Sequence, residues 1–95
     1  MLEKRLEAKF CKRIARTGSL PLKFVSPGQA GVPDRIILIP GGRVRFAELK
    51  KPGGKLRPLQ VHTVKRFRKL GFTVHVVDSA EKIECIAREI EEELS

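Results

Sequence analysis

The stretch from residue 35 to residue 49 constrains the fold most, because it carries two β-type runs joined by a tight turn. Arg35–Ile39 is rich in β-branched and aliphatic residues, Val44–Leu49 is a second run of strand composition, and Pro40-Gly41-Gly42 separates them. Such runs favour strands, and a short glycine-containing turn joins antiparallel neighbours. The sequence therefore predicts a β-hairpin over these residues.

The remainder of the chain alternates between helical and β-type segments. Apolar residues recur at the spacing of one helix face in three segments, and two further runs have strand composition. The expected helices span residues 2–16, Pro58–Leu70 and Ala80–Leu94, and the other expected strands span Leu22–Ser26 and Phe72–Val77. This order predicts an α/β chain with a mixed (α+β) sheet flanked by helices. At 95 residues, we expect one domain over residues 1–95.

The charge of the chain is unevenly distributed. The net charge is +9, which divides into +13 over residues 1–80 and −4 over residues 81–95. A basic surface of this kind attracts polyanions, either nucleic acid or an acidic membrane. No apolar run approaches the roughly 18–20 residues that cross a bilayer, so we expect no membrane-spanning segment, and the charge alone does not decide between the two polyanions. The late acids are expected to form a solvated helix end; they are Glu89, Glu91, Glu92 and Glu93.

Several other classes of site find no support in the sequence. The charged start of the chain has no signal-peptide core, and Cys11 and Cys85 lack the spacing of a zinc site, so we expect reduced core thiols in a cytoplasmic protein. His62 and His75 have no partner at ligand spacing and are expected to be structural. No glycine-rich loop precedes Lys-Ser/Thr, so no nucleotide cofactor is expected.

Two carboxylates should meet at one end of the predicted hairpin. Asp34 stands directly before the first strand, and Glu48 and Lys50 lie two residues apart on the second, so their side chains share a face. Asp34, Glu48 and the backbone carbonyl of Leu49 would offer hard oxygen ligands to Mg²⁺ or Mn²⁺. Such an ion can activate water against a phosphodiester, and Lys50 could help to deprotonate that water or stabilise transition-state charge.

These residues resemble a known signature. Gly31-Val32-Pro33-Asp34-Arg35 followed by Glu48-Leu49-Lys50 resembles the motif of PD-(D/E)XK nucleases. The wider pattern is similar to the VRR-Nuc branch in its stand-alone phage and bacterial form. It adds an N-terminal helix with a glutamate, Lys23-Phe24, Ser26-Pro27-Gly28, Phe46-Ala47 and Gln60.

The resemblance implies a restriction-endonuclease-like αβββαβ core, here followed by a C-terminal helix. It implies a Mg²⁺/Mn²⁺-dependent, structure-selective DNA endonuclease, and links the stand-alone form to Holliday-junction (four-way junction) cleavage by homodimers. It adds Gln60 to the catalytic set and aligns Glu7 as a further metal carboxylate, although Glu3 shares the same helix face. The cations around the expected cleft are predicted to contact DNA phosphates; they are Lys23, Lys51, Lys55 and Arg57.

Two other functions stay open at this point. The same fold with an inactive site could grip branched DNA for a partner, and a metal-free basic architectural protein would bind DNA without cutting it. The sequence also leaves open the preferred DNA structure, the cut position and the pathway. A dimer could use the apolar face of either the first or the last helix.

Overall fold

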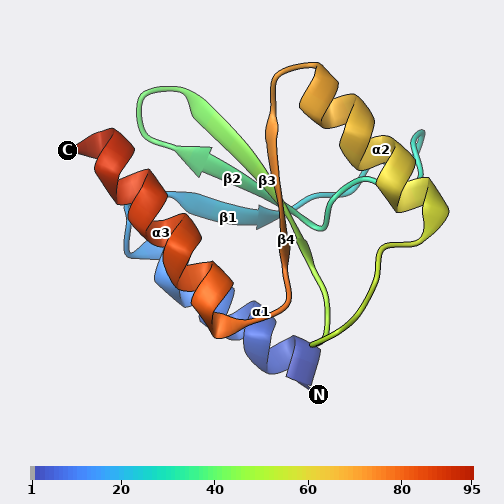
Figure 1. Cartoon of the computed structure of the whole chain (residues 1–95). Coiled ribbons are helices and arrows are strands. Elements are labelled where there is room, and N and C mark those ends of the chain that lie inside the picture. The colour runs from blue at the N-terminus through green and yellow to red at the C-terminus, as the bar shows by residue number, and fades with distance from the viewer. Residues whose placement is uncertain (1) are drawn as a thin grey trace.

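The computed structural model describes residues 2–95, with side chains described from residue 4 onward. The order αβββαβα is the predicted one (Figure 1), and the elements are α1 (Leu2–Ala15), β1 (Leu20–Lys23), β2 (Arg35–Ile39), β3 (Arg43–Leu49), α2 (Pro58–Lys69), β4 (Thr73–Val77) and α3 (Ala80–Leu94). Strand β1 begins two residues before the predicted Leu22–Ser26 and ends at Lys23, so it includes Pro21. Proline is tolerated in β1 since this strand lies at the sheet edge, where a missing N–H need not pair.

The four strands form one mixed sheet in the order β1-β2-β3-β4. β1 and β2 are antiparallel, as are β2 and β3, whereas β3 and β4 are parallel. The β2–β3 hairpin is confirmed, with Arg35 opposite Ala47 and Ile39 opposite Arg43. Gly41 and Gly42 both have positive φ, at 88° and 77°, which is the backbone that a tight hairpin turn requires.

Helices cover both faces of the sheet. Figure 1 shows α1 and α3 together on one side of the strands and α2 on the other. The face under α1 and α3 carries the larger core, formed by Phe10, Ile14, Ile37, Ile39, Ala47, Leu49, Val77, Ile83, Ile86, Ala87 and Ile90. On the α2 face, Phe46 packs against three aromatic rings, with centroids 4.9 Å from Phe67, 5.5 Å from Phe24 and 5.6 Å from Phe72.

The packing of α1 and α3 corrects part of the sequence interpretation. The apolar faces of both helices lie inside the chain, where Phe10, Ile14 and Ile90 are fully buried, so neither face is free to form a dimer interface. Cys85 is exposed rather than a core thiol, whereas Cys11 packs against the core. None of the described helices is both long and apolar enough to cross a membrane.

The sequence predicted that the acidic residues late in α3 form a solvated helix end, but several of them form ion pairs in the structure. Glu89 and Glu93 lie 2.7 and 2.9 Å from the guanidinium of Arg45 on β3. Glu91 lies 3.1 Å from Arg13 on α1, and Glu84 lies 2.9 Å from it. These ion pairs bring charge compensation to arginines whose side chains are largely covered, at 12% and 14% exposure.

His75 has a structural role beside Arg45, as expected. Its Nε2 lies 3.1 Å from Nη1 of Arg45, which donates to the neutral imidazole. Burial and the Arg45 charge lower the pKa of His75 below its usual value, so the ring stays neutral at physiological pH.

Candidate active site

Asp34 and Glu48 meet where β2 begins and β3 ends, as the hairpin predicted. The backbone N–H of Asp34 donates to Oε1 of Glu48 over 3.2 Å. In return, the backbone N–H of Leu49 donates to Oδ2 of Asp34 over 3.0 Å. The two carboxylates are thus fixed relative to each other by reciprocal hydrogen bonds between neighbouring strands.

The loop before Asp34 is held against α2 by a close contact at Gly31. Gly31 has a φ of +82°, and a Cβ there would lie 3.0 Å from Oγ1 of Thr63 and 3.1 Å from Leu59. Any other residue would meet both backbone strain and steric conflict. Thr63 also donates to the carbonyl of Ala30 over 3.3 Å, so the Gly-Val-Pro-Asp segment is seated on α2.

Glu48 is buried and faces only donors. Its Oε2 accepts from Nε2 of Gln60 over 2.8 Å and lies 3.4 Å from Nζ of Lys50. Its Oε1 accepts from the backbone N–H of Asp34. An amide at this position would turn its NH₂ group against a donor, so the environment specifies a carboxylate. Burial and the nearby Asp34 charge raise the pKa of Glu48, and Lys50 opposes that rise. A buried carboxylate beside a second, half-buried one is a place where added positive charge is favourable.

Lys50 and Leu49 show opposite orientations at the end of β3. The Lys50 ammonium lies on the Glu48 side of the sheet, as the two-residue spacing predicted. The Leu49 side chain is 2% exposed and belongs to the core under α1 and α3. The backbone N–H of Lys50 donates to the carbonyl of Val77 over 2.8 Å, which extends the parallel pairing with β4 and fixes the lysine's position.

Gln60 links the start of α2 to Glu48. Its Oε1 accepts from the backbone N–H of Arg57, the residue before the helix, over 2.9 Å, and its Nε2 donates to Glu48. The amide orientation follows from these partners, since Arg57 N–H requires an acceptor and the Glu48 carboxylate a donor. The structure therefore brings together Asp34, Glu48, Lys50 and Gln60.

Glu7 does not join this cluster. It lies on the α1 side of the sheet, where its Oε2 is 3.2 Å from Nη2 of Arg35. Arg35 also donates to the carbonyl of Pro21 over 3.1 Å, so the pair ties α1 to β1 and β2. Glu3, the other glutamate considered, begins α1 one turn earlier, and its side chain lies outside the described part of the chain.

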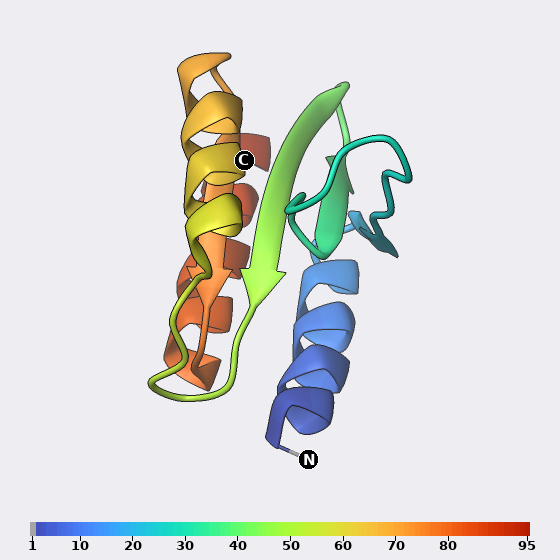
Figure 2. The same ribbon diagram turned by 90° about the vertical axis from the view of Figure 1, so that its right-hand side faces the viewer.

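The predicted DNA-contacting cations are exposed near the cluster. Lys51, Lys55 and Arg57 lie on the segment that joins β3 to α2, between Lys50 and Gln60 in sequence. Lys23 ends β1 opposite Arg35, and the next residue donates its N–H to the carbonyl of Asp34 over 2.7 Å. Figures 1 and 2 place the β3–α2 segment at the end of β3, beside the first half of α1.

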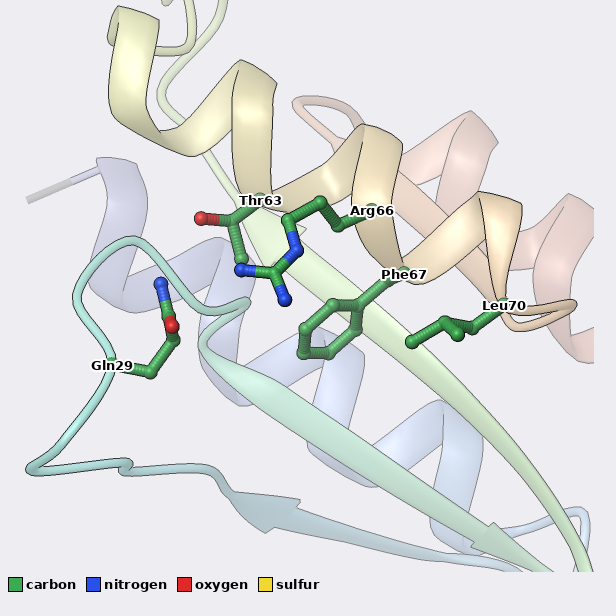
Figure 3. A pocket seen from close by; sticks show the side chains of 5 residues that line it. All are labelled: Gln29, Thr63, Arg66, Phe67 and Leu70. Carbon is green, nitrogen blue, oxygen red and sulfur yellow. The ribbon is translucent and has the colours of Figure 1, made fainter.

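A small hollow between α2 and the loop before Asp34 contains Gln29 and Arg66, which the sequence did not single out. Gln29, from the loop before Asp34, faces Arg66 of α2 across a cavity of about 90 Å³ (Figure 3). Thr63, Phe67 and Leu70 complete its lining. Gln29 and Arg66 lie 31 and 6 residues from Gln60, so only the tertiary fold brings these donors to the same side of the sheet as Glu48.

The donor set fits a hard divalent cation. Asp34 and Glu48 supply carboxylate oxygens and the Leu49 carbonyl would supply a third oxygen, which leaves room for waters and a phosphate oxygen around Mg²⁺. Among the side chains that the structure describes, no group of three or more His, Cys, Asp or Glu converges. The site is therefore suited to an ion that keeps part of its water shell, and not to a cage formed by protein alone.

Comparison with known proteins gives a consistent result. The VRR-NUC domain model matches residues 3–81. A protein named "Putative nuclease p44", from Acyrthosiphon pisum secondary endosymbiont phage 1, is 40% identical over 77 residues, which cover 81% of this chain and 83% of that protein. A solved structure described as a VRR_NUC domain superposes with a TM-score of 0.86 and 30% identity, covering 93% of this chain and 96% of that one.

The match covers the strands and helices that hold Asp34, Glu48, Lys50 and Gln60. The resemblance inferred from the motif is thereby confirmed, and so is the mixed-sheet fold. The chain belongs to the VRR-NUC domain family of nucleases.

Proposed function

We propose that the protein is a Mg²⁺- or Mn²⁺-dependent DNA endonuclease. The observation that carries this proposal is the position of Asp34 beside Glu48, whose carboxylate also contacts Lys50 and Gln60. Asp34, Glu48 and the Leu49 carbonyl would hold the metal. When bound, such an ion supplies Lewis-acid activation of water and of the scissile phosphate.

The other residues of the site have separate roles in this proposal. The Lys50 ammonium, 3.4 Å from Glu48, is placed to orient a water molecule or to stabilise negative charge that develops on the phosphate. Gln60 is a positioning residue, because its amide fixes Glu48 in one orientation. Lys23, Lys51, Lys55 and Arg57 bind the DNA backbone, where cations act without reading sequence.

We further propose that a homodimer acts on four-way junctions. Resolution of a junction requires two symmetric nicks, and one chain holds a single site. A two-fold dimer is the common assembly of small soluble chains. The α1 and α3 faces are buried, but the α2 face of the sheet is left uncovered over β1 and β2: Leu20 is 56% exposed, Leu22 45% and Leu38 38%. Leu20 pairs directly with Leu38, so these side chains share one face, and a second copy would bury them.

Cleavage assays with site variants test the chemistry. Linear, flap and four-way DNA would be incubated with the protein in Mg²⁺, in Mn²⁺ and in EDTA. We expect cleavage in either metal, none in EDTA, and loss of cleavage in Asp34→Ala and Glu48→Ala with DNA binding retained. Wild-type rates in either variant would overturn the site assignment. Affinity without any cleavage would favour the inactive-module or architectural alternative.

A second assay addresses the helix-1 glutamate and the dimer. If Glu3 contributes to the metal site, Glu3→Gln should lose cleavage. Glu7→Gln should then mainly lose stability, because Glu7 is paired with Arg35. Loss of cleavage in Glu7→Gln alone would favour Glu7 as the metal ligand. Leu22→Lys should shift the molar mass from dimer to monomer in light scattering and reduce junction cleavage. A monomeric wild-type protein on DNA, or equal cleavage of duplex and junction, would remove the resolvase proposal and leave the nuclease chemistry intact.

A further inference from the structure

A row of cations on α1 is not used by the proposed catalytic site. Arg5, Lys9 and Lys12 on α1, and Arg16 directly after its last residue, are all exposed, and the N–H of Arg16 continues the helical bonding to the carbonyl of Lys12. At about 100° of rotation per residue they fall within a sector of about 60°, on the side of the helix away from Phe10. Neighbouring like charges destabilise a helix, so helix formation alone does not favour such a row.

Acidic partners lie close by but are committed elsewhere. Helix α3 packs beside α1, yet Glu84 and Glu91 pair with Arg13, which lies outside the row. Glu89 and Glu93 pair with Arg45 on the sheet. Within the described part of the chain, no ion pair or side-chain hydrogen bond involves any of the four row residues. The row therefore keeps its four positive charges for an external partner.

The row lines a continuous groove, which we call the α1 groove. Two adjoining depressions of about 460 and 360 Å³ share Lys9 and Ala80. The first is lined by Arg5, Leu6, Lys9, Pro52, Asp78, Ser79 and Ala80, and the second by Lys9, Lys12, Arg13, Arg16, Ala80, Ile83 and Glu84. Its two acids are compensated, since Asp78 lies 3.0 Å from Lys82 and Glu84 is paired with Arg13.

The α1 groove begins at the catalytic end of the sheet. Pro52 follows Lys50 by two residues, and Asp78 follows Val77, whose carbonyl accepts the Lys50 N–H. Figures 1 and 2 agree that the end of β3 lies beside the first half of α1. At about 1.5 Å of rise per residue, the row then extends about 16 Å away from this end. One strand of B-form DNA carries about five phosphates over that length.

We propose that the α1 groove is a second DNA-binding surface, which holds the phosphate backbone of a further arm of a branched DNA. This inference rests on the proposed nuclease function and adds to it a basis for structure selectivity. The cations near the catalytic site, Lys23, Lys51, Lys55 and Arg57, contact the arm that is cut. The row on α1 contacts an arm that leaves the junction on the other side of the sheet. A linear duplex can occupy one of these surfaces, whereas a four-way junction can occupy both.

The test measures binding separately from cleavage. Fluorescence anisotropy without divalent cations would give Kd for a four-way junction and for a linear duplex as a function of salt. The row variant is Arg5→Gln with Lys9→Gln, Lys12→Gln and Arg16→Gln. If the row variant loses four phosphate contacts, the magnitude of the slope of log K against log salt for the junction should fall by about 3.6. Between about 50 and 200 mM salt, the wild-type affinity should then decline about 150-fold more than the affinity of the variant. Duplex binding should change far less.

A double variant with a matched control separates a specific contact from net charge. Lys9→Gln/Lys12→Gln and Lys65→Gln/Lys69→Gln each remove two exposed charges, the second pair from α2. The first should lower the junction slope by about 1.8 and the second should leave it near wild type. Equal losses in both, or equal losses for junction and duplex, would overturn the proposal. Cleavage in Mn²⁺, followed in parallel, reports on the nuclease proposal alone, so either proposal can fail without the other.

Discussion

Replacement of Gln60 tests whether the contact between α2 and the catalytic carboxylate determines stability as well as activity. Gln60 is 6% exposed and makes two side-chain hydrogen bonds, to the Arg57 N–H and to Glu48. A neutral hydrogen bond contributes about 1 kcal/mol and one to a charged group about 1.5–3 kcal/mol. Gln60→Ala should therefore cost about 3 kcal/mol. At about 4–8 °C per kcal/mol for a domain of this size, Tm should fall by roughly 12–24 °C.

Chemical and thermal unfolding at pH 7 would measure this change, with His62→Ala as a control on the same helix. His62 is exposed and follows Gln60 by two residues, so its truncation should change the free energy of unfolding by no more than about 0.5 kcal/mol. Equal stabilities of the two variants would refute the assigned role of the Gln60 amide.

Gln60→Glu keeps the size and the acceptor for Arg57 while placing a second carboxylate against Glu48. The new carboxyl would have a folded-state pKa above its unfolded value, because it faces a buried charge. Its stability contribution is then present at low pH and lost as the pH rises through the folded pKa. The variant should therefore be less destabilised at acidic pH than at neutral pH. A pH-independent difference from wild type would show that Glu48 does not interact with position 60.

Three further outcomes follow from the site and the ion pairs. Lys50→Ala should abolish cleavage of junction DNA. Lys50→Arg should not restore cleavage fully, because a guanidinium cannot deprotonate and has a different donor geometry. Full activity of the arginine variant would show that the site needs only a positive charge at this position. Mg²⁺ at a hundredfold excess over its Kd should stabilise wild type by about 2.7 kcal/mol in urea unfolding, and Asp34→Asn should lose that gain. Arg13 and Arg88 lower the pKa of Glu84 to about 2. The contribution of Glu84 to folding stability is therefore present above about pH 4.5 and is lost as the pH falls toward 2. In unfolding experiments, Glu84→Gln should be less stable than wild type at neutral pH and equally stable in acid.

The hairpin and the helices could be predicted from sequence because their signals are local. The side-chain alternation of a strand places Glu48 and Lys50 on one face, and their ammonium–carboxylate distance of 3.4 Å agrees with that prediction. The Gln60 contact could not be found this way. It spans a connection of irregular backbone, and no periodicity relates a helix start to the strand before it, so only the family resemblance pointed to this residue.

Helical periodicity also has a limit that Glu7 illustrates. The angle around α1 correctly places Glu7 beside the apolar face, but it gives no information on which face of the sheet carries Glu48. In the structure Glu7 pairs with Arg35 on the α1 face of the sheet, whereas Glu48 contacts Gln60 of α2 on the other face. The Arg45 ion pairs show the same limit for long-range contacts, because Glu89 and Glu93 lie 44 and 48 residues away in sequence and leave no local trace of their partner.

The pairing of carboxylates distinguishes the candidate metal site from the remainder of the molecule. Among the described side chains outside the site, Glu7, Glu84, Glu89, Glu91 and Glu93 are each matched with an arginine and Asp78 with Lys82, while Glu81 and Glu92 are exposed to solvent. Glu48 instead lies beside Asp34, whose charge raises the pKa of Glu48, and the one cation paired with Glu48 is the ammonium of Lys50. Two negative charges against one positive charge, with one carboxylate buried, leave an imbalance that proteins relieve by protonation or by a cation. A divalent ion would reverse the local sign and would bring the phosphate of an approaching DNA strand to the residues that can act on it.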